Sequence, residues 1–483
     1  MKRFKLFLLI SSIAFFVYGQ NPEWFYATTD APSAHSLKTN YPDQIQILDT
    51  FNEVSAVYMS RDASMQLKNN GNLHGPGYIF KSNEEAARTA IYNVQEAHLG
   101  VLDFTIDQDD FVNQLLTQVD TQNIGDVILD MEAYGTRFNT KPAGIQASHD
   151  LKDRWQGMAT DVGRTDVTVE AFNHSFTDQI SVILTIPGST YPDEIVIIGG
   201  HLDSGDFWLQ DNAPGADDNG SGIATLTEVL RILLANDFHP LRTVQFMAYA
   251  AEEIGLYGSA DIAENYADNN KNVLAVMQLD MTNYNGSAFD IAIISDGAHT
   301  SGTLNLFLVD LLEHYNSGGE HPITYDFSYC GYACSDHASW AANGYMASFP
   351  FESGFGEHNP YIHSPNDTYA KMGNTAEHSA KFVKLGLEFI VETAKTAQMG
   401  TNDIHRPQLM VVVKDRSLIY DLGAVPAGGN SVVVFDPSGK KLVERQQLKS
   451  SGNLSLQGLP NGLYIAVFKD KNGKAYSKKF LLK

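Results

Sequence analysis

The chain has 483 residues, which at ~150 residues per domain predicts about three units, and its 57 acidic against 33 basic side chains give a formal net charge of −24. That charge argues against nucleic acid as a partner, and the content of 43% hydrophobic and 11% aromatic residues excludes global disorder. The two cysteines exclude a disulfide-rich scaffold, a cysteine-based zinc finger and an iron–sulfur cluster.

The first segment, residues 1–20, has the pattern of a secretory signal peptide. Lys2, Arg3 and Lys5 precede an apolar run from Leu6 to Val17, which ends in small and polar residues. An uncleaved membrane anchor is the less favoured alternative, because a span needs ~20 apolar residues. We therefore expect export through the periplasm, followed by a secreted location that is either extracellular or at the cell surface.

The second segment, residues 21–100, combines short apolar runs with one helical pattern. IQILDTF (45–51) and VSAVYM (54–59) are the apolar runs, and the helical pattern lies around Ser82–Leu99. The segment shows no cluster of candidate ligands. It is predicted to be either a small accessory domain or a pro-region.

The third segment, residues 101–400, alternates strand and helix patterns. Continuous apolar runs at 193–200, 243–250, 272–280 and 289–294 predict buried strands. Between the first two, a helical face is predicted from its spacing of apolar residues, namely Ile223, Leu226, Leu230 and Leu233. A second helix is expected near Gly258–Tyr266. This alternation predicts an α/β domain with a largely parallel sheet.

The last segment, residues 408–483, is predicted to be a small all-β module. Its apolar runs SVVVF, GLYIAVF and KKFLL are separated by turn signals such as Asn472-Gly473. From Lys440 onward it holds ten basic and two acidic residues, which reverses the charge of the rest of the chain. The polar stretch Thr401–Gln408 before it is a predicted linker.

Candidate metal ligands follow the predicted strands of the α/β domain. In open α/β sheets, sites form beyond the carboxyl ends of the strands. The residues at these ends, at the start of the first helix and on a later loop are His201, Asp203, Glu252, Glu253, Asp280, the pair Asp217-Asp218, and His363. Taken singly, each has an ordinary structural explanation as a solvated loop residue, a helix cap or an exposed turn.

Taken together, these residues predict a metal centre. So many carboxylates and imidazoles at one sheet edge would repel one another and lose solvation unless cations neutralised them. Histidine nitrogens with carboxylate oxygens suit zinc, and less exclusively cobalt or manganese. The number of ligands favours two metal ions bridged by one aspartate over a single ion.

Six motifs carry a family resemblance. They are GGHLDS (199–204), PGADDNGSG (214–222), AYAAEEIGLYGS (248–259), QLDMTNY (278–284), CGYACSDHASW (330–340) and NPYIHSPNDT (359–368). In order and spacing they resemble the secreted bacterial leucyl aminopeptidases with a co-catalytic di-zinc centre, over roughly residues 105–400. The resemblance implies a mixed-sheet, phosphorylase/hydrolase-like α/β domain that releases one N-terminal residue at a time from peptides and proteins.

The resemblance also implies a role for each site residue. His201 and Asp280 would hold one Zn²⁺, Glu253 and His363 would hold the second, and Asp217 would bridge both. Asp203 would orient the imidazole of His201. Two zinc ions ~3.5–4 Å apart polarise the scissile carbonyl and lower the pKa of a bridging water. Glu252 would take the proton of that water and deliver it to the departing amine. One metal would meet the free α-amine, which explains exopeptidase action.

Further residues are implied to contact substrate or to support the site. The family has a disulfide where Cys330 and Cys334 lie, although two buried thiols are the alternative. Tyr332 resembles a tyrosine whose hydroxyl points at the substrate carbonyl oxygen. The residues that match the side-chain pocket are Met281, Ile294, Phe349, Phe351, Phe355 and Ile362. They imply a preference for Leu-like or aromatic N-terminal residues, although Phe349 stands where the family pattern has methionine.

The final segment resembles the C-terminal sorting modules of the type IX secretion system, which implies the secretion machinery as a partner. A carbohydrate-binding or adhesive module, or a β-sandwich that stabilises the enzyme, are the alternatives. For the whole chain, the alternatives to a secreted aminopeptidase are a non-catalytic surface adhesin and a related carboxypeptidase or dipeptidase. The complete ligand set argues against the adhesin. The lack of a long inserted lid segment argues against the carboxypeptidase.

Overall fold

The computed structural model describes residues 23–68, 74–92, 104–205, 210–297, 299–318, 322–396, 410–414, 416–421, 431–436, 440–449, 451–469 and 475–482. The predicted signal peptide (1–20) and the predicted linker (401–408) lie outside the described residues. Among the helices of the described ranges, none combines the length and the apolar character needed to cross a membrane.

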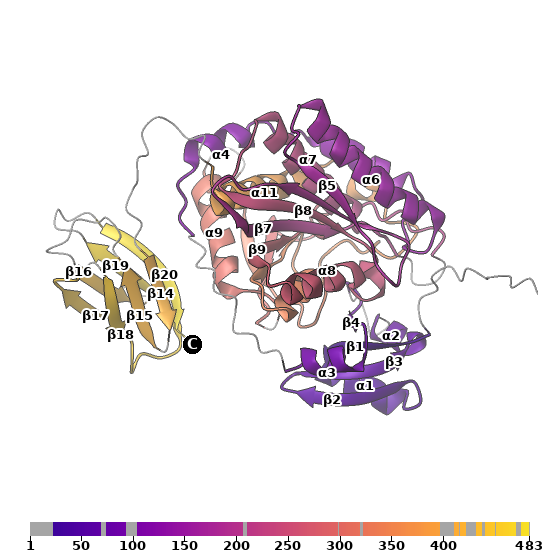
Figure 1. The fold of residues 1–483 in the computed structure, drawn as a ribbon, viewed down its shortest axis with the longest axis horizontal. Helices are drawn as coiled ribbons and strands as arrows, with labels where there is room; N and C mark the ends of the chain where they lie inside the picture. The colour runs from indigo at the N-terminus through magenta and orange to yellow at the C-terminus, as the bar shows by residue number, and fades with distance from the viewer. Residues whose placement is uncertain are drawn as a thin grey trace, which may run out of the picture.

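The N-terminal domain is a small antiparallel sheet covered by short helices (Figure 1). Its strands, in the order β2-β3-β1-β4, are β2 (Ile45–Phe51), β3 (Val54–Ser60), β1 (Trp24–Asp30) and β4 (Ile79–Lys81). Its helices are α1 (Ala31–Asn40), α2 (Arg61–Lys68) and α3 (Glu84–Ala90). The helix predicted around Ser82–Leu99 is α3, which ends at Ala90 within the described residues. Asp30 caps α1 by accepting a hydrogen bond from the N–H of Ser33.

The central sheet of the α/β domain is mixed and largely parallel, as predicted. Its strands, in spatial order, are β12 (Ala347–Ser348), β9 (Asn272–Gln278), β7 (Tyr191–His201), β8 (Arg242–Tyr249), β6 (Ser181–Ile186) and β5 (Thr168–Phe172). The first four run parallel, and β6 and β5 are antiparallel additions. Parallel neighbours β9, β7 and β8 therefore end at the same edge of the sheet.

Helices cover both faces of this sheet, which explains why its strands are apolar on both sides (Figure 1). Val196 and Ile198 of β7 face the core shared with α7 and α11, whereas Ile197 faces the core shared with α8 and α10. The helices of the domain are α4 (Asp109–Leu116), α5 (Thr121–Glu132), α6 (Pro142–Asp161), α7 (Gly220–Ala235), α8 (Tyr257–Asp268), α9 (Gly302–Asn316), α10 (His337–Ala342) and α11 (Ser379–Ala394), with short 3-10 helices η1 (Glu252–Ile254) and η2 (Tyr369–Met372).

One predicted strand belongs to a different sheet. The run at 289–294 forms β10 (Ile291–Ile294), which pairs in parallel with β11 (Tyr325–Ser328) and antiparallel with β13 (Pro350–Phe351). The apolar run identified a buried strand correctly, but it does not contain the information that selects the pairing partner. Residues of this small sheet belong to the apolar cluster described below.

The C-terminal unit is all-β, as predicted, and consists of two antiparallel sheets (Figure 1). One contains β14 (Met410–Lys414), β15 (Ser417–Asp421) and β18 (Ser451–Ser455). The other contains β17 (Lys441–Gln446), β16 (Ser431–Phe435), β19 (Gly462–Lys469) and β20 (Ala475–Leu482). Their shared apolar core draws only on residues of this unit within the described ranges.

Candidate metal centre

The carboxyl ends of β7, β8 and β9 bring the predicted ligands together. His201 is the last residue of β7, Glu252 and Glu253 form the short helix η1 just after β8, and Asp280 lies two residues beyond β9. All four side chains are buried, with His201 1% and Asp280 0% exposed. Because parallel neighbours end at one edge, these groups share a single cluster.

Asp218 is the carboxylate at the middle of this cluster. Its Oδ1 lies 3.1 Å from Nε2 of His201, and its Oδ2 lies 3.0 Å from Nε2 of His363. On the first side, His201 Nε2 also lies 3.2 Å from Oδ1 of Asp280. On the second side, His363 Nε2 lies 3.2 Å from Oε2 of Glu253. One carboxylate therefore connects two groups of potential ligands.

This geometry corrects the prediction that Asp217 is the bridging residue. The carboxylate of Asp217 accepts hydrogen bonds from the side chain of Asn359 (3.0 Å) and from the N–H of Asn283 (3.2 Å). The carboxylate of Asp367 fixes the turn by accepting hydrogen bonds from the N–H groups of Asp217 (3.1 Å) and Asp218 (3.0 Å). With the backbone held in this way, Asp218 faces the histidines and Asp217 faces the loop that carries Asn359.

The electrostatics of the two aspartates differ accordingly. Burial is the main influence on the pKa of Asp217 and raises it to about 6. Burial acts on Asp218 too, but hydrogen bonds from His201 and His363 outweigh it and bring the pKa of Asp218 well below its ordinary value. Asp218 is therefore the more strongly anionic of the pair, as a ligand shared by two cations should be.

The donor set fits zinc. Asp218, Glu253 and His363 place one ligand atom each within 4.8 Å of one another, and Asp218 and Asp280 do so with a third residue, His74. His201 contacts both Asp218 and Asp280, as the distances above show. Imidazole nitrogens with carboxylate oxygens are ligands that zinc prefers, and buried carboxylates at this density call for positive charge.

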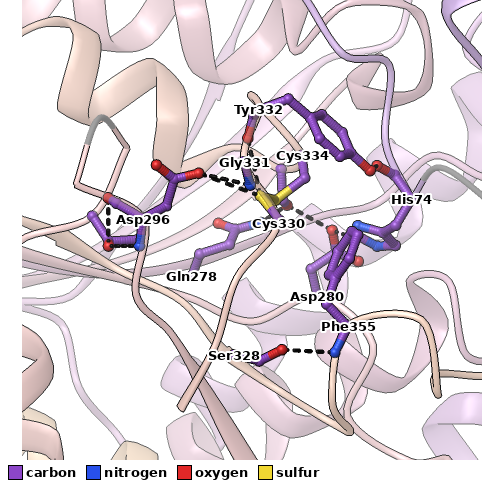
Figure 2. Close-up of a disulfide and its surroundings, with 12 residues drawn as sticks. His74, Gln278, Asp280, Asp296, Ser328, Cys330, Gly331, Tyr332, Cys334 and Phe355 are labelled. Atoms are coloured by element: carbon purple, nitrogen blue, oxygen red, sulfur yellow. Dashed lines mark hydrogen bonds and ion pairs between the residues drawn. A yellow bond between two sulfur atoms is a disulfide. The ribbon is translucent and has the colours of Figure 1, made fainter.

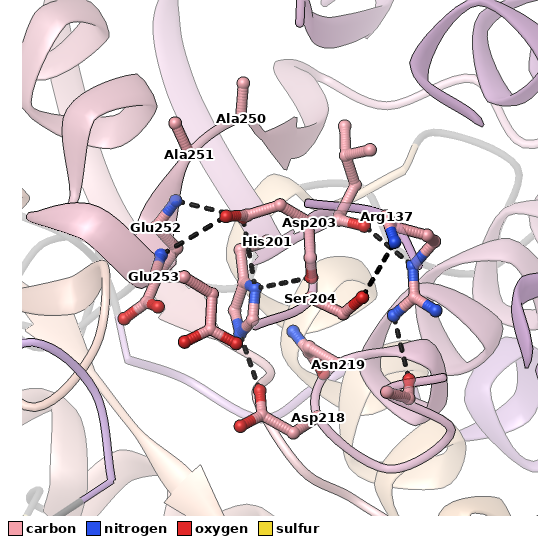
Figure 3. A network of polar contacts seen from close by, with 12 residues as sticks. Arg137, His201, Asp203, Ser204, Asp218, Asn219, Ala250, Ala251, Glu252 and Glu253 are labelled. Carbon is pink, nitrogen blue, oxygen red and sulfur yellow. Dashed lines mark hydrogen bonds and ion pairs between the residues drawn. The ribbon is translucent and has the colours of Figure 1, made fainter. Parts of the chain in front are cut away.

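Asp203 holds the first histidine and the two glutamates in place (Figure 3). It is fully buried, and its two carboxylate oxygens accept hydrogen bonds from the N–H groups of Glu252 (2.9 Å) and Glu253 (3.3 Å). Nδ1 of His201 lies 3.2 Å from the backbone carbonyl oxygen of Asp203 and 3.5 Å from its carboxylate Oδ1. A carboxylate on the far nitrogen of a ligating imidazole fixes the orientation of the ring.

Glu252 lies beside the ligands without belonging to either group. Its side chain is 1% exposed, and its Oε1 has no hydrogen-bond partner among the described residues. Burial raises the pKa of Glu252 well above its ordinary value, against the opposing charge of His201. A carboxyl group in this state is suited to accept and return a proton.

Arg137 is a supporting residue that the sequence analysis missed. Its buried guanidinium donates to the carbonyl oxygens of Leu202 (2.9 Å), Pro214 (2.6 Å) and Gly215 (2.8 Å) (Figure 3). These carbonyls lie directly after His201 and shortly before Asp218 in the chain. No local pattern marks Arg137 in the sequence, because these three partners lie 65, 77 and 78 residues further along the chain.

The predicted pocket residues gather in one apolar cluster beside the metal centre. Cys330 and Cys334 form a disulfide, and the loop that they close carries Tyr332 (Figure 2). The cluster around this loop includes every residue assigned above to the side-chain pocket, namely Met281, Ile294, Phe349, Phe351, Phe355 and Ile362. The three phenylalanines approach one another with ring centroids 5.3 Å and 5.8 Å apart.

His74 is the second residue that the sequence analysis missed, because the sequence of residues 21–100 contains no cluster of candidate ligands and its partners lie in the α/β domain. It belongs to the N-terminal domain, is 1% exposed, and places Nε2 3.3 Å from Oδ2 of Asp280 (Figure 2). The sequence Asn72-Leu73-His74-Gly75 does not indicate a metal ligand, since a single histidine in a glycine-rich stretch has no second ligand residue at a fixed spacing from it.

Comparisons with known proteins find a peptidase family and aminopeptidases. The family model described as "Peptidase family M28" matches residues 181–386. A probable aminopeptidase of Saccharomyces cerevisiae, YDR415C, is 36% identical over 59% of this chain and 76% of its own length. Leucine aminopeptidase 1 of Trichoderma harzianum is 37% identical over 55% of this chain and 67% of its own.

Solved structures give the same result. The crystal structure of LapB from Legionella pneumophila aligns with a TM-score of 0.66 and 27% identity, covering 77% of this chain and all of LapB. The LapA aminopeptidase of the same organism aligns with a TM-score of 0.66 and 28% identity over 78% of this chain.

Proposed function

Because the chain belongs to peptidase family M28 and is a metallo-aminopeptidase, we propose that it is a two-zinc enzyme that releases Leu-like or aromatic residues from the N-termini of peptides and proteins. The observation that carries this proposal is the position of Asp218, whose two oxygens lie against two different histidines. Two groups of ligands that share one carboxylate are what a pair of adjacent metal ions needs.

The ligand assignment follows from these contacts. His201 and Asp280 would hold one zinc ion, Glu253 and His363 the other, and Asp218 would bridge them. Bound zinc supplies Lewis acidity, which polarises a carbonyl oxygen and lowers the pKa of a water molecule. Asp203 supports this arrangement, because it holds both the imidazole of His201 and the backbone of Glu253.

The proton transfers are assigned to Glu252. Its carboxylate accepts a proton from the attacking water and returns it to the amine that leaves when the peptide bond breaks. Glu253, one residue later, serves as a ligand. The shared anchor on Asp203 keeps the backbone of both glutamates fixed while one side chain exchanges protons and the other does not.

Substrate selection is assigned to two features. The apolar cluster formed by Phe349, Phe351, Phe355 and its neighbours would accept the side chain of the N-terminal residue. The free α-amine would bind at the metal centre through its nitrogen lone pair, which the nitrogen of an acylated or internal amide does not offer. Tyr332, a member of this cluster, would donate a hydrogen bond to the substrate carbonyl oxygen, and its hydroxyl donates to the carbonyl oxygen of His74 in the structure.

A panel of aminoacyl chromogenic substrates tests this function. We expect leucyl and phenylalanyl derivatives to be hydrolysed faster than lysyl or aspartyl ones, and N-acetyl-leucyl derivatives not to be hydrolysed. A zinc chelator should remove the activity, and added Zn²⁺ should restore it. Equal hydrolysis of blocked substrates would contradict aminopeptidase action, and release of C-terminal residues from peptides would favour the carboxypeptidase alternative.

We further propose that the enzyme is exported and that residues 408–483 serve sorting through the secretion machinery. The module has an apolar core of its own and an excess of basic residues, and the ligand groups all lie before it. A stop codon after Gly400 should therefore leave kcat/KM on a leucyl substrate unchanged. In the native host, the truncated enzyme should remain in the periplasm.

Two measurements check this prediction, namely kinetics of the truncated enzyme purified from a heterologous host and fractionation of the native host. Normal appearance of the truncated enzyme in the culture medium would contradict the sorting role. A large activity loss in well-folded truncated protein would show instead that the module stabilises the enzyme.

A further inference from the structure

His74 stands at the metal centre although it belongs to another domain. Its Nε2 lies 3.3 Å from Oδ2 of Asp280, whereas His201 contacts the other oxygen, Oδ1, of the same carboxylate. Ligand atoms of His74, Asp218 and Asp280 all lie within 4.8 Å of one another, and all three residues are buried. This is the spacing at which one metal ion can bind all three.

The backbone around His74 is held by the loop of the disulfide. The hydroxyl of Tyr332 donates a 2.6 Å hydrogen bond to the carbonyl oxygen of His74 (Figure 2). Gly75 has a φ of +71°, and a Cβ on this residue would overlap the carbonyl oxygen of Cys334. Only glycine therefore fits at this contact.

The imidazole of His74 also stands among the aromatic rings assigned to the substrate side chain. Its ring centroid lies 6.2 Å from that of Phe349, 5.2 Å from that of Phe351 and 6.5 Å from that of Phe355. The segment thus makes the contacts that an N-terminal residue of a substrate would make: its carbonyl meets Tyr332 and its side chain meets the aromatic cluster.

The N-terminal domain is firmly docked where it presents this segment. Phe80 of β4 stacks on Tyr257 of α8 with ring centroids 3.9 Å apart, and its N–H donates to the carbonyl of Gly255 (3.0 Å). Tyr78 donates to the carbonyl of Ile254 (2.7 Å), which belongs to η1. The helix that carries Glu252 and Glu253 is therefore in contact with the domain that carries His74.

We propose that His74 is a further zinc ligand and that the N-terminal domain uses it to hold the enzyme closed. The imidazole would help to hold the same metal ion as His201 and Asp280, at a position that a substrate group would otherwise take. Activation then requires that the segment with His74 and Gly75 leave the metal centre and that a substrate group replace the imidazole nitrogen. This inference rests on the proposed two-zinc function and selects the pro-region over the accessory domain for residues 21–100.

Cobalt-loaded, full-length protein tests the ligand, because the visible absorption of Co²⁺ depends on the donors around the ion. We expect His74→Ala to change the absorption bands. His358→Ala is the matched control: its ring lies 6.1 Å from that of His74 in the same aromatic cluster, but it belongs to neither ligand group. The control should leave the bands unchanged. Bands of His74→Ala identical to wild type would overturn the proposal.

Kinetics of the zinc-loaded wild-type and variant proteins test whether the N-terminal domain holds the enzyme closed. His74→Ala and Gly75→Ala should each raise kcat/KM on a leucyl substrate about tenfold or more. If about one tenth of the wild-type molecules are open, their apparent affinity for substrate is about tenfold lower than that of an enzyme that is always open. Gly75→Ala keeps the imidazole and disturbs the contact of its segment with the backbone of Cys334, so it provides an independent variant if His74→Ala folds poorly. A fall in kcat/KM in both variants would overturn the closure, because His74 would then serve the active enzyme.

The two readouts separate this inference from the proposed function. If the cobalt bands respond to His74→Ala while no variant hydrolyses any aminoacyl substrate, the aminopeptidase proposal fails and the ligand assignment is supported. If the wild-type chain is fully active and neither readout responds to His74→Ala, the aminopeptidase proposal stands and the His74 inference fails.

Discussion

Replacing Glu252 with glutamine is expected to lower kcat about 10³-fold while leaving the metal content unchanged. The amide has the shape of the carboxyl group but accepts no proton, and general acid–base catalysis contributes typically 10²–10⁴-fold. Glu252 is in neither ligand group, and its backbone remains anchored on Asp203 whatever its side chain is. Steady-state kinetics on a leucyl substrate and elemental analysis of the purified protein measure the two quantities.

Glu253→Gln is the matched comparison, since it makes the same change one residue away. Glu253 contacts His363 as part of a ligand group, so this variant should lose metal together with activity. An activity loss of less than tenfold in Glu252→Gln, or a metal loss that parallels its activity loss, would show that the assignment of the proton-transfer role is wrong.

The sequence predicted the convergence of His201, Glu253 and Asp280 because that convergence depends on strands alone. Each of these residues follows a buried apolar run, and parallel strands β7, β8 and β9 must end at one sheet edge once they pair. The strand β10 shows the limit of this reasoning, since its apolar run does not reveal that it pairs with β11 and β13.

The features that escaped prediction depend on contacts between distant segments. His74 reaches the centre only because β4 docks against α8, and Arg137 matters only because two loops fold around it. The choice between Asp217 and Asp218 is local, yet it was also missed. Adjacent aspartates in an irregular turn have no periodicity, and the turn is fixed by Asp367, about 150 residues further along the chain.

The substitution Asp218→Asn should therefore remove most of the bound metal, whereas Asp217→Asn should not. Asp218 is the one carboxylate common to both ligand groups, so its replacement weakens both positions, and the content should fall from about two ions, as in a two-metal site, to well below one. Asp217→Asn should keep its metal and lose only stability, by ~1–3 kcal/mol, because its amide has one accepting oxygen where the carboxylate has two, and these two now serve Asn359 and the N–H of Asn283. Elemental analysis and thermal denaturation of the two variants measure these outcomes side by side. If Asp217→Asn lost the metal and Asp218→Asn retained it, the bridge would belong to Asp217 after all. Because the two variants differ only in which of two neighbouring carboxylates is neutralised, a difference in metal content between them cannot arise from net charge and must come from the direction in which the turn points each side chain.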